Sequence, residues 1–139
     1  MKKFALLSIL LLGIFASGLA ANFGISVPSP YLVTEWRCGQ DLNIQWSKWG
    51  DWTYPNYEPT NQKVRILLRK VLPVKARFVA PIVIAENVPA TTVTGKYLWK
   101  ISNVTNGEYH VIVETMNKMT KGESEVFTIK GCLQKIIID

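Results

Sequence analysis

Residues 106–115 read NGEYHVIVET, and this stretch decides the fold. It opens on Asn-Gly, the dipeptide most typical of a tight turn before a strand. Tyr109, Val111 and Val113 then alternate with other residues, which is the period of a half-buried β-strand. The segment therefore predicts a strand that starts directly after a turn and packs one face against a core.

The same short, alternating pattern recurs along the chain, and no long stretch has helical periodicity. Strands are expected over residues 23–27, 41–46, 63–70, 78–88, 96–101, 108–115 and 123–129. Seven short strands separated by turn signals favour an all-β, seven-stranded, antiparallel sandwich of the immunoglobulin or fibronectin-III type. Pro81 lacks a ladder donor and predicts an edge strand or a bulge. Tyr109 is placed as the tyrosine corner of such a sandwich, with its hydroxyl on upstream backbone.

The first 20 residues are expected to be a cleaved signal peptide, and the alternative is an uncleaved membrane anchor. Lys2 and Lys3 form a basic start, an apolar run follows, and Gly18 and Ala20 provide the small residues of a cleavage site. Cleavage after Ala20 would leave one Ig-like domain, residues 21–139, and would lower the net charge from +6 to +4. No second apolar run reaches spanning length, so no transmembrane segment is expected. The predicted location is secreted, extracellular or at the cell surface, with the periplasm as a possibility.

Composition narrows the chemistry further. The 139 residues contain two Cys and one His, which excludes a four-Cys zinc site and a His-pair metal site. No nucleophile-elbow, phosphate-loop or zinc-protease motif occurs, and the carboxylates are scattered. His110 alternates with Tyr109 and is expected on the outer face of its strand. We therefore expect no catalytic residues, no metal and no cofactor.

The two cysteines, Cys38 and Cys132, are predicted to form a disulfide. Cys38 precedes the strand at 41–46 and Cys132 follows the last strand, and these two positions share one pole of a sandwich. Export to an oxidising compartment favours a bond over the alternative of two free, buried thiols. The chain-entropy model gives roughly 4–5 kcal/mol for closing so long a loop.

The segment 48–62 is the candidate ligand-binding loop. It contains four large aromatic residues among turn-forming and polar ones: Trp49, Trp52, Tyr54 and Tyr57, with Asp51 and Asn56 between them. Aromatic faces suit sugar rings, and the polar side chains suit sugar hydroxyls. Lys118, Met119 and Lys121 are expected along one edge of the same site. The alternative is that the aromatic residues fold inward and cap the core.

A basic cluster follows this loop and contains no acid: Lys63, Arg65, Arg69, Lys70, Lys75 and Arg77. It is read either as a solvated outer face or as a contact for anionic polymers or membrane head groups outside the cell. Nucleic acid is not an expected partner, because an exported protein seldom meets it. Asn103-Val104-Thr105 is an N-glycosylation sequon on a turn, usable only in a host with that machinery.

Several short motifs, in this order, resemble one known family. They are ISVPSP (25–30), WRCGQ (36–40), IQW (44–46), VRILL (64–68), IAENV (84–88), YLW (97–99), GEY (107–109) and SEVFTI (124–129). Together they resemble the N-terminal Ig-like domain of the yeast cell-wall glucan-synthesis proteins, also described as the Ser-Thr-rich GPI-anchored family. The resemblance implies a surface or secreted fibronectin-III-like sandwich associated with cell-wall polysaccharide. It implies no catalytic residues.

The residues and the resemblance together predict a non-catalytic binding module for extracellular carbohydrate or cell-envelope polymer. The alternative is a structural surface, filament or adhesion subunit. The sequence does not predict an oligomeric state.

Overall fold

The computed structural model describes residues 23–30, 33–52, 62–75 and 77–133, and these residues form strands and connecting segments without an α-helix. One sheet has the order β1 (Phe23–Ser26), β3 (Asp41–Gly50), β6 (Thr94–Lys100). The second has the order β2 (Glu35–Arg37), β9 (Phe127–Lys130), β7 (Gly107–Thr115), β4 (Lys63–Lys70), β5 (Ile82–Pro89), and β8 (Lys121–Glu123) also pairs with β7. No helix among the described residues could cross a bilayer.

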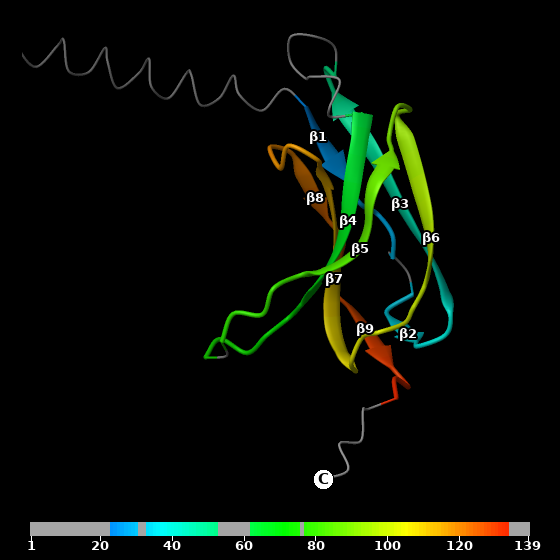
Figure 1. Ribbon diagram of the computed structural model, residues 1–139, viewed down its shortest axis with the longest axis vertical. Coiled ribbons are helices and arrows are strands. Elements are labelled where there is room, and N and C mark those ends of the chain that lie inside the picture. The colour runs from blue at the N-terminus through cyan, green and yellow to red at the C-terminus, as the bar shows by residue number, and fades with distance from the viewer. Residues whose placement is uncertain (1–22, 31–32, 53–61, 76, 134–139) are drawn as a thin grey trace, which may run out of the picture.

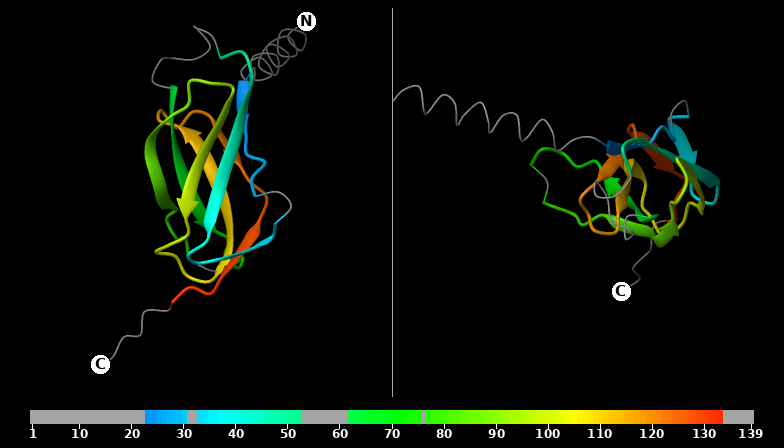
Figure 2. Two further views of the ribbon diagram at one scale, coloured as in Figure 1. Left: turned by 90° about the vertical axis from the view of Figure 1, so that its right-hand side faces the viewer. Right: turned by 90° about the horizontal axis from the view of Figure 1, so that it is seen from above.

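The two sheets pack face to face as a sandwich (Figures 1 and 2), which confirms the predicted fold class. The core lies between them, and its largest fully buried side chains are Trp46, Tyr109 and Phe127. Alternation along β3 buries Leu42, Ile44 and Trp46 and leaves the residues between them exposed. Burial of this apolar face is the main source of stability for the fold, at roughly 25 cal/mol per Å² removed from water.

The number of strands differs from the expectation: nine strands form in the described residues, where seven were predicted. β2 was missed because three residues, Glu35–Arg37, carry too little alternation, and it is held by parallel pairing with β9. The predicted strand 123–129 is divided between β8 and β9. Between them, the Ser124 hydroxyl accepts a hydrogen bond from the Val111 amide, which interrupts the ladder.

The predicted strand 78–88 is corrected at its start, since β5 begins at Ile82. Pro81 directly precedes β5, and β5 is an edge strand, as the proline had indicated. Residues 77–81 instead belong to an arm that leaves the sandwich between β4 and β5 (Figure 1). Apolar character alone does not distinguish a strand from an exposed arm, and this caused the error.

Two predicted side-chain links are present, one local and one long-range. The Tyr109 hydroxyl donates to the backbone oxygen of Thr105 at 2.6 Å, which is the expected tyrosine corner. Cys38 and Cys132 form a disulfide with a Cα–Cα distance of 5.0 Å. The bond continues the parallel pairing of β2 with β9, because the Cys38 amide donates to the Lys130 oxygen at 3.0 Å.

Candidate functional site

The candidate site lies at the end of β3, opposite the pole that carries the disulfide. β3 continues to Gly50, so Lys48 and Trp49 belong to a strand, although both were expected in a loop. β1 pairs with this end of β3, with Gly24 opposite Trp49 and Ile25 opposite Lys48. Regular pairing with β1 therefore fixes the backbone position of Trp49, the first aromatic residue of the predicted binding segment.

Trp49 lies on the outer face of the three-stranded sheet, out of phase with the buried Trp46, and its exposed fraction is 51%. Its indole ring covers the backbone of Gly24, so that a Cβ added at Gly24 would lie 2.3 Å from the Trp49 Cζ2 atom. Only glycine lets the ring approach the neighbouring strand this closely. Trp49 thus does not continue the core packing of Trp46, and one part of its ring remains accessible to solvent.

Trp52 has a different environment, because it is half-buried and packs against the core. Its indole Nε1 donates to the Trp49 oxygen at 3.0 Å, and its ring contacts Phe23 at a centroid distance of 4.8 Å with a tilt of 59°. Tilted aromatic pairs of this kind are favourable beyond the area that they bury. Trp52 therefore supports Trp49 and also packs on the core, as the capping alternative predicted.

Lys48 occupies the core-facing phase at the same end of β3. Its ammonium group donates to the Ala90 oxygen and lies 5.1 Å from the centroid of the Trp52 ring, within the range of a cation–π contact. Burial lowers the pKa of Lys48 below its usual value, because the charged form loses hydration. Phe23, Lys48, Trp49 and Trp52 together are called the aromatic pole below.

The remaining residues of the predicted site are placed only in part. Asp51 is exposed beside Trp52. Tyr54, Asn56 and Tyr57 lie outside the described residues, so the prediction for them stands as made. The β7–β8 turn lies at this pole (Figure 1), because Gly122 of β8 approaches β1 so closely that a Cβ there would lie 2.2 Å from the Ile25 oxygen. Met119 on that turn is exposed, as are Lys118 and Lys121.

The six residues of the basic cluster do not share one uncompensated surface. Arg65 pairs with Glu114, its register partner on β7, and Arg69 pairs with Glu123 of β8 at 2.9 Å. Lys70 donates to the Thr105 hydroxyl at 3.0 Å and lies over the Tyr109 ring. The two acidic partners, Glu114 and Glu123, belong to strands that are distant in sequence. The absence of acids within the basic segment therefore did not predict whether its charges are paired. Lys63, Lys75 and Arg77 are exposed.

His110 is half-buried on the outer face of β7, as predicted, and its Nδ1 lies 2.9 Å from the Ser124 oxygen. No group of three or more His, Cys, Asp or Glu residues close enough to hold a metal ion occurs in the described part of the chain. The outer face of β7 therefore carries a structural hydrogen bond and ion pairs.

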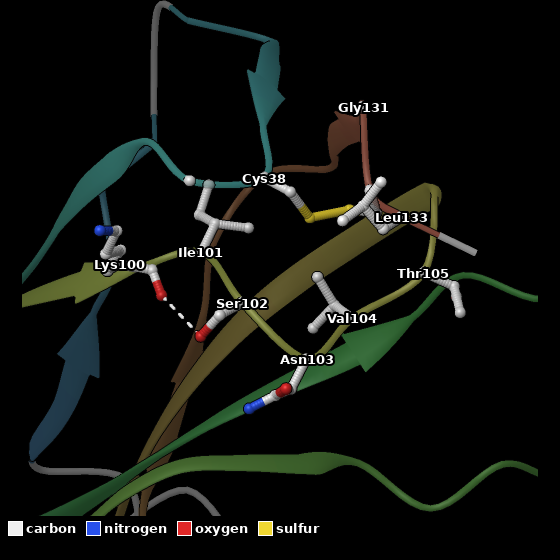
Figure 3. Close-up of a pocket in the computed structure, with 11 residues that line it drawn as sticks. Cys38, Lys100, Ile101, Ser102, Asn103, Val104, Thr105, Gly131 and Leu133 are labelled. Atoms are coloured by element: carbon white, nitrogen blue, oxygen red, sulfur yellow. Dashed lines mark hydrogen bonds between the residues drawn. A yellow bond between two sulfur atoms is a disulfide. The ribbon is translucent and has the colours of Figure 1, made fainter. Parts of the chain in front are cut away.

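The sequence reasoning missed a shallow, open pocket at the disulfide pole (Figure 3). Its volume is about 710 Å³, and its apolar lining includes Ile101, Val104, Leu133 and the disulfide. Asn103 of the sequon lies at its edge with an exposed side chain and a φ of 59°. No motif signals this pocket, because its walls come from three segments far apart in the sequence.

Comparison with known proteins adds little to this geometry. No protein-family model matches the chain, and a comparison with curated proteins finds no relative of it. Among solved structures, a β-glucosidase from Listeria innocua in complex with glucose aligns with a TM-score of 0.46 and 14% identity. The alignment covers 81% of this chain and 16% of that enzyme, and a likeness this weak carries no argument about function.

Proposed function

We propose that this protein is a secreted, non-catalytic module that binds extracellular carbohydrate or cell-envelope polymer through the aromatic pole. The observation that carries the proposal is the half-exposed ring of Trp49, held against β1 over Gly24. A sugar ring has apolar C–H faces, and a flat indole offers a matching surface at low cost in side-chain entropy.

The surroundings of Trp49 support recognition by a prepositioned surface. The Trp52 indole donates to the Trp49 backbone oxygen, and Phe23 and Lys48 in turn contact the Trp52 ring. Preorganisation of this kind lowers the entropy lost on binding. Asp51, which directly precedes Trp52, is exposed, and its carboxylate is suited to accept hydrogen bonds from sugar hydroxyls. The motif-level resemblance to a cell-wall Ig-like domain points to the same class of ligand.

The experiment is sedimentation of the purified, exported protein with insoluble polysaccharides and with the envelope fraction of its own cells. Trp49→Ala should abolish binding and leave the melting temperature nearly unchanged, because the ring lies on the outer face. Leu98→Ala is the matched control, since Leu98 is exposed on the outer face of the same sheet. Equal binding by Trp49→Ala and the unmodified protein would contradict the proposal.

The alternative function is a structural or adhesion subunit, and one observation favours it. β5 is an edge strand, and its Ile82 and Val83 side chains are exposed, so further strands have a place to pair. Sedimentation velocity over a range of protein concentrations distinguishes the two functions. Reversible growth of large assemblies without any polysaccharide would favour the structural role.

A further inference from the structure

The arm between β4 and β5, made of residues 71–75 and 77–81, projects away from the sandwich (Figure 1 and the right-hand view of Figure 2). Its base is fixed, because the Val71 amide donates to the Glu108 oxygen at 2.8 Å. Beyond that bond, none of its described residues belongs to a strand. The arm is therefore a narrow projection whose side chains face solvent on more than one side.

The arm exposes several large apolar side chains. Val74 is fully exposed, Phe78 has an exposed fraction of 85%, and Val79 is also exposed. Ile82 and Val83, at the start of β5, are also exposed. Several large apolar side chains exposed on one short projection are unusual for a small domain and point to an interaction site, whereas single exposed residues such as Leu98 require no explanation.

Two cations accompany these side chains. Lys75 and Arg77 lie between Val74 and Phe78 in sequence, both are exposed, and neither forms an ion pair within the described residues. No acidic residue occurs from Lys63 to Ala85. Arg65 and Arg69 on β4 are paired with acids of the neighbouring strands, whereas, in the described part of the chain, the two cations of the arm are not.

We propose that this arm docks on the surface of an anionic lipid bilayer. Val74, Phe78 and Val79 would enter the interfacial layer, while Lys75 and Arg77 contact the lipid phosphates. Apolar burial combined with attraction to anionic lipids is the usual basis of interfacial binding. A second copy of the chain is a poorer occupant, because a symmetric contact between two arms would bring like charges together.

The test is flotation of the full exported chain with two kinds of vesicle. One consists of phosphatidylcholine alone, and the other includes about one third phosphatidylserine, which supplies the negative surface. The protein should float with the anionic vesicles, and Phe78→Asp and Val74→Asp should each abolish flotation. Leu98→Asp is the matched control, because it places the same charge on an exposed apolar site of the other sheet. Circular dichroism melting checks that each variant is folded.

The charge component is tested by Lys75→Glu/Arg77→Glu, with Lys96→Glu/Lys100→Glu as the matched pair on β6. The arm pair should weaken binding about tenfold or more, and the β6 pair should have a much smaller effect. Absence of flotation with anionic vesicles would overturn the proposal, and so would equal binding to both kinds of vesicle. A concentration-dependent dimer that Phe78→Asp dissociates, without vesicle binding, would assign the arm to self-association instead. Polysaccharide binding should survive every arm variant, so this proposal and the proposed function can fail independently.

Discussion

The Trp49 ring covers Gly24 of the neighbouring strand, and a Cβ at position 24 would fall 2.3 Å from the ring. Gly24→Ala should therefore displace the indole and abolish polysaccharide binding even though Trp49 itself is retained. The free energy of unfolding should change by less than about 1 kcal/mol, because the displaced ring lies at the surface. Sedimentation with polysaccharide and urea unfolding measure the two effects.

Two other substitutions on the same sheet provide controls for this prediction. Ser26→Ala, on an exposed position of β1, should leave binding intact. Gly95→Ala should affect stability and not the position of Trp49, since its Cβ would meet the ring of the buried Trp46 at 2.1 Å. Overpacking of that kind costs about 1–3 kcal/mol, so stability should fall. Retention of full binding by Gly24→Ala would show that the position of the Trp49 ring is not what the ligand recognises.

The Cys38–Cys132 disulfide closes a sequence separation of 94 residues. Cys38→Ser/Cys132→Ser should lower the free energy of unfolding by about 2–5 kcal/mol, because the unfolded chain regains the entropy that the closed loop removed. The shift of the urea midpoint measures it. Unmodified protein with its disulfide reduced should unfold at nearly the same midpoint as the double variant, and an unchanged midpoint in both would contradict the prediction.

The parts of the fold that could be predicted are those in which burial alternates along a strand, because this alternation is visible in the sequence. The strands that hold Ile44, Ile66 and Val111 were predicted because one face of each strand packs on the core and alternation records this burial. The tyrosine corner was predictable for a related reason, since Asn106-Gly107 fixes where β7 begins. β2 was not predictable, because a three-residue strand is held by its partner β9 and not by a pattern of its own.

The candidate site was predictable only in composition. A cluster of aromatic residues after Trp46 is visible in the sequence, but the exposed position of Trp49 depends on the length of β3 and on Gly24 in another strand. The basic cluster illustrates the same difficulty. The pairing of Arg65 with Glu114 results from strand register across two sequence-distant strands, and no local pattern contains that information.

Asn103 is expected to carry an N-linked glycan when the protein is exported by a eukaryotic secretory host. Its side chain is exposed at the edge of the disulfide-pole pocket (Figure 3), and its sequon is the only one in the sequence. Intact mass should fall on treatment with an N-glycosidase, and Asn103→Gln should lack the added mass, whereas Asn106→Gln should retain it. The ten residues of β3 span roughly 30 Å. The glycan should therefore leave binding at the aromatic pole unaffected.

Tyr109→Phe removes the hydroxyl that donates to the Thr105 oxygen and leaves the buried ring in place. The expected loss is about 0.5–1.5 kcal/mol of unfolding free energy, the usual net worth of one hydrogen bond. Tyr97→Phe is the control, because no hydrogen bond of the Tyr97 hydroxyl occurs among the described residues. Urea unfolding of both variants measures the difference, and equal losses would show that the corner contributes nothing specific.

Lys48 makes stability depend on pH in a direction opposite to that of a lysine in a stabilising ion pair. Burial lowers its pKa in the folded protein, whereas the unfolded chain keeps a value near 10.5. Between the lowered pKa and 10.5, the unfolded state binds a proton that the folded state does not, so the unfolding free energy rises with pH in that window.

The variant Lys48→Met lacks this contribution to the pH dependence. The unfolding free energy of the unmodified protein minus that of Lys48→Met should therefore increase as pH rises toward 10.5, because the other titrating groups cancel in the difference. Urea unfolding of both proteins at several alkaline pH values measures it. A difference that falls with pH would mean that Lys48 is stabilised in its charged form by the Trp52 ring and the Ala90 oxygen more than burial destabilises it.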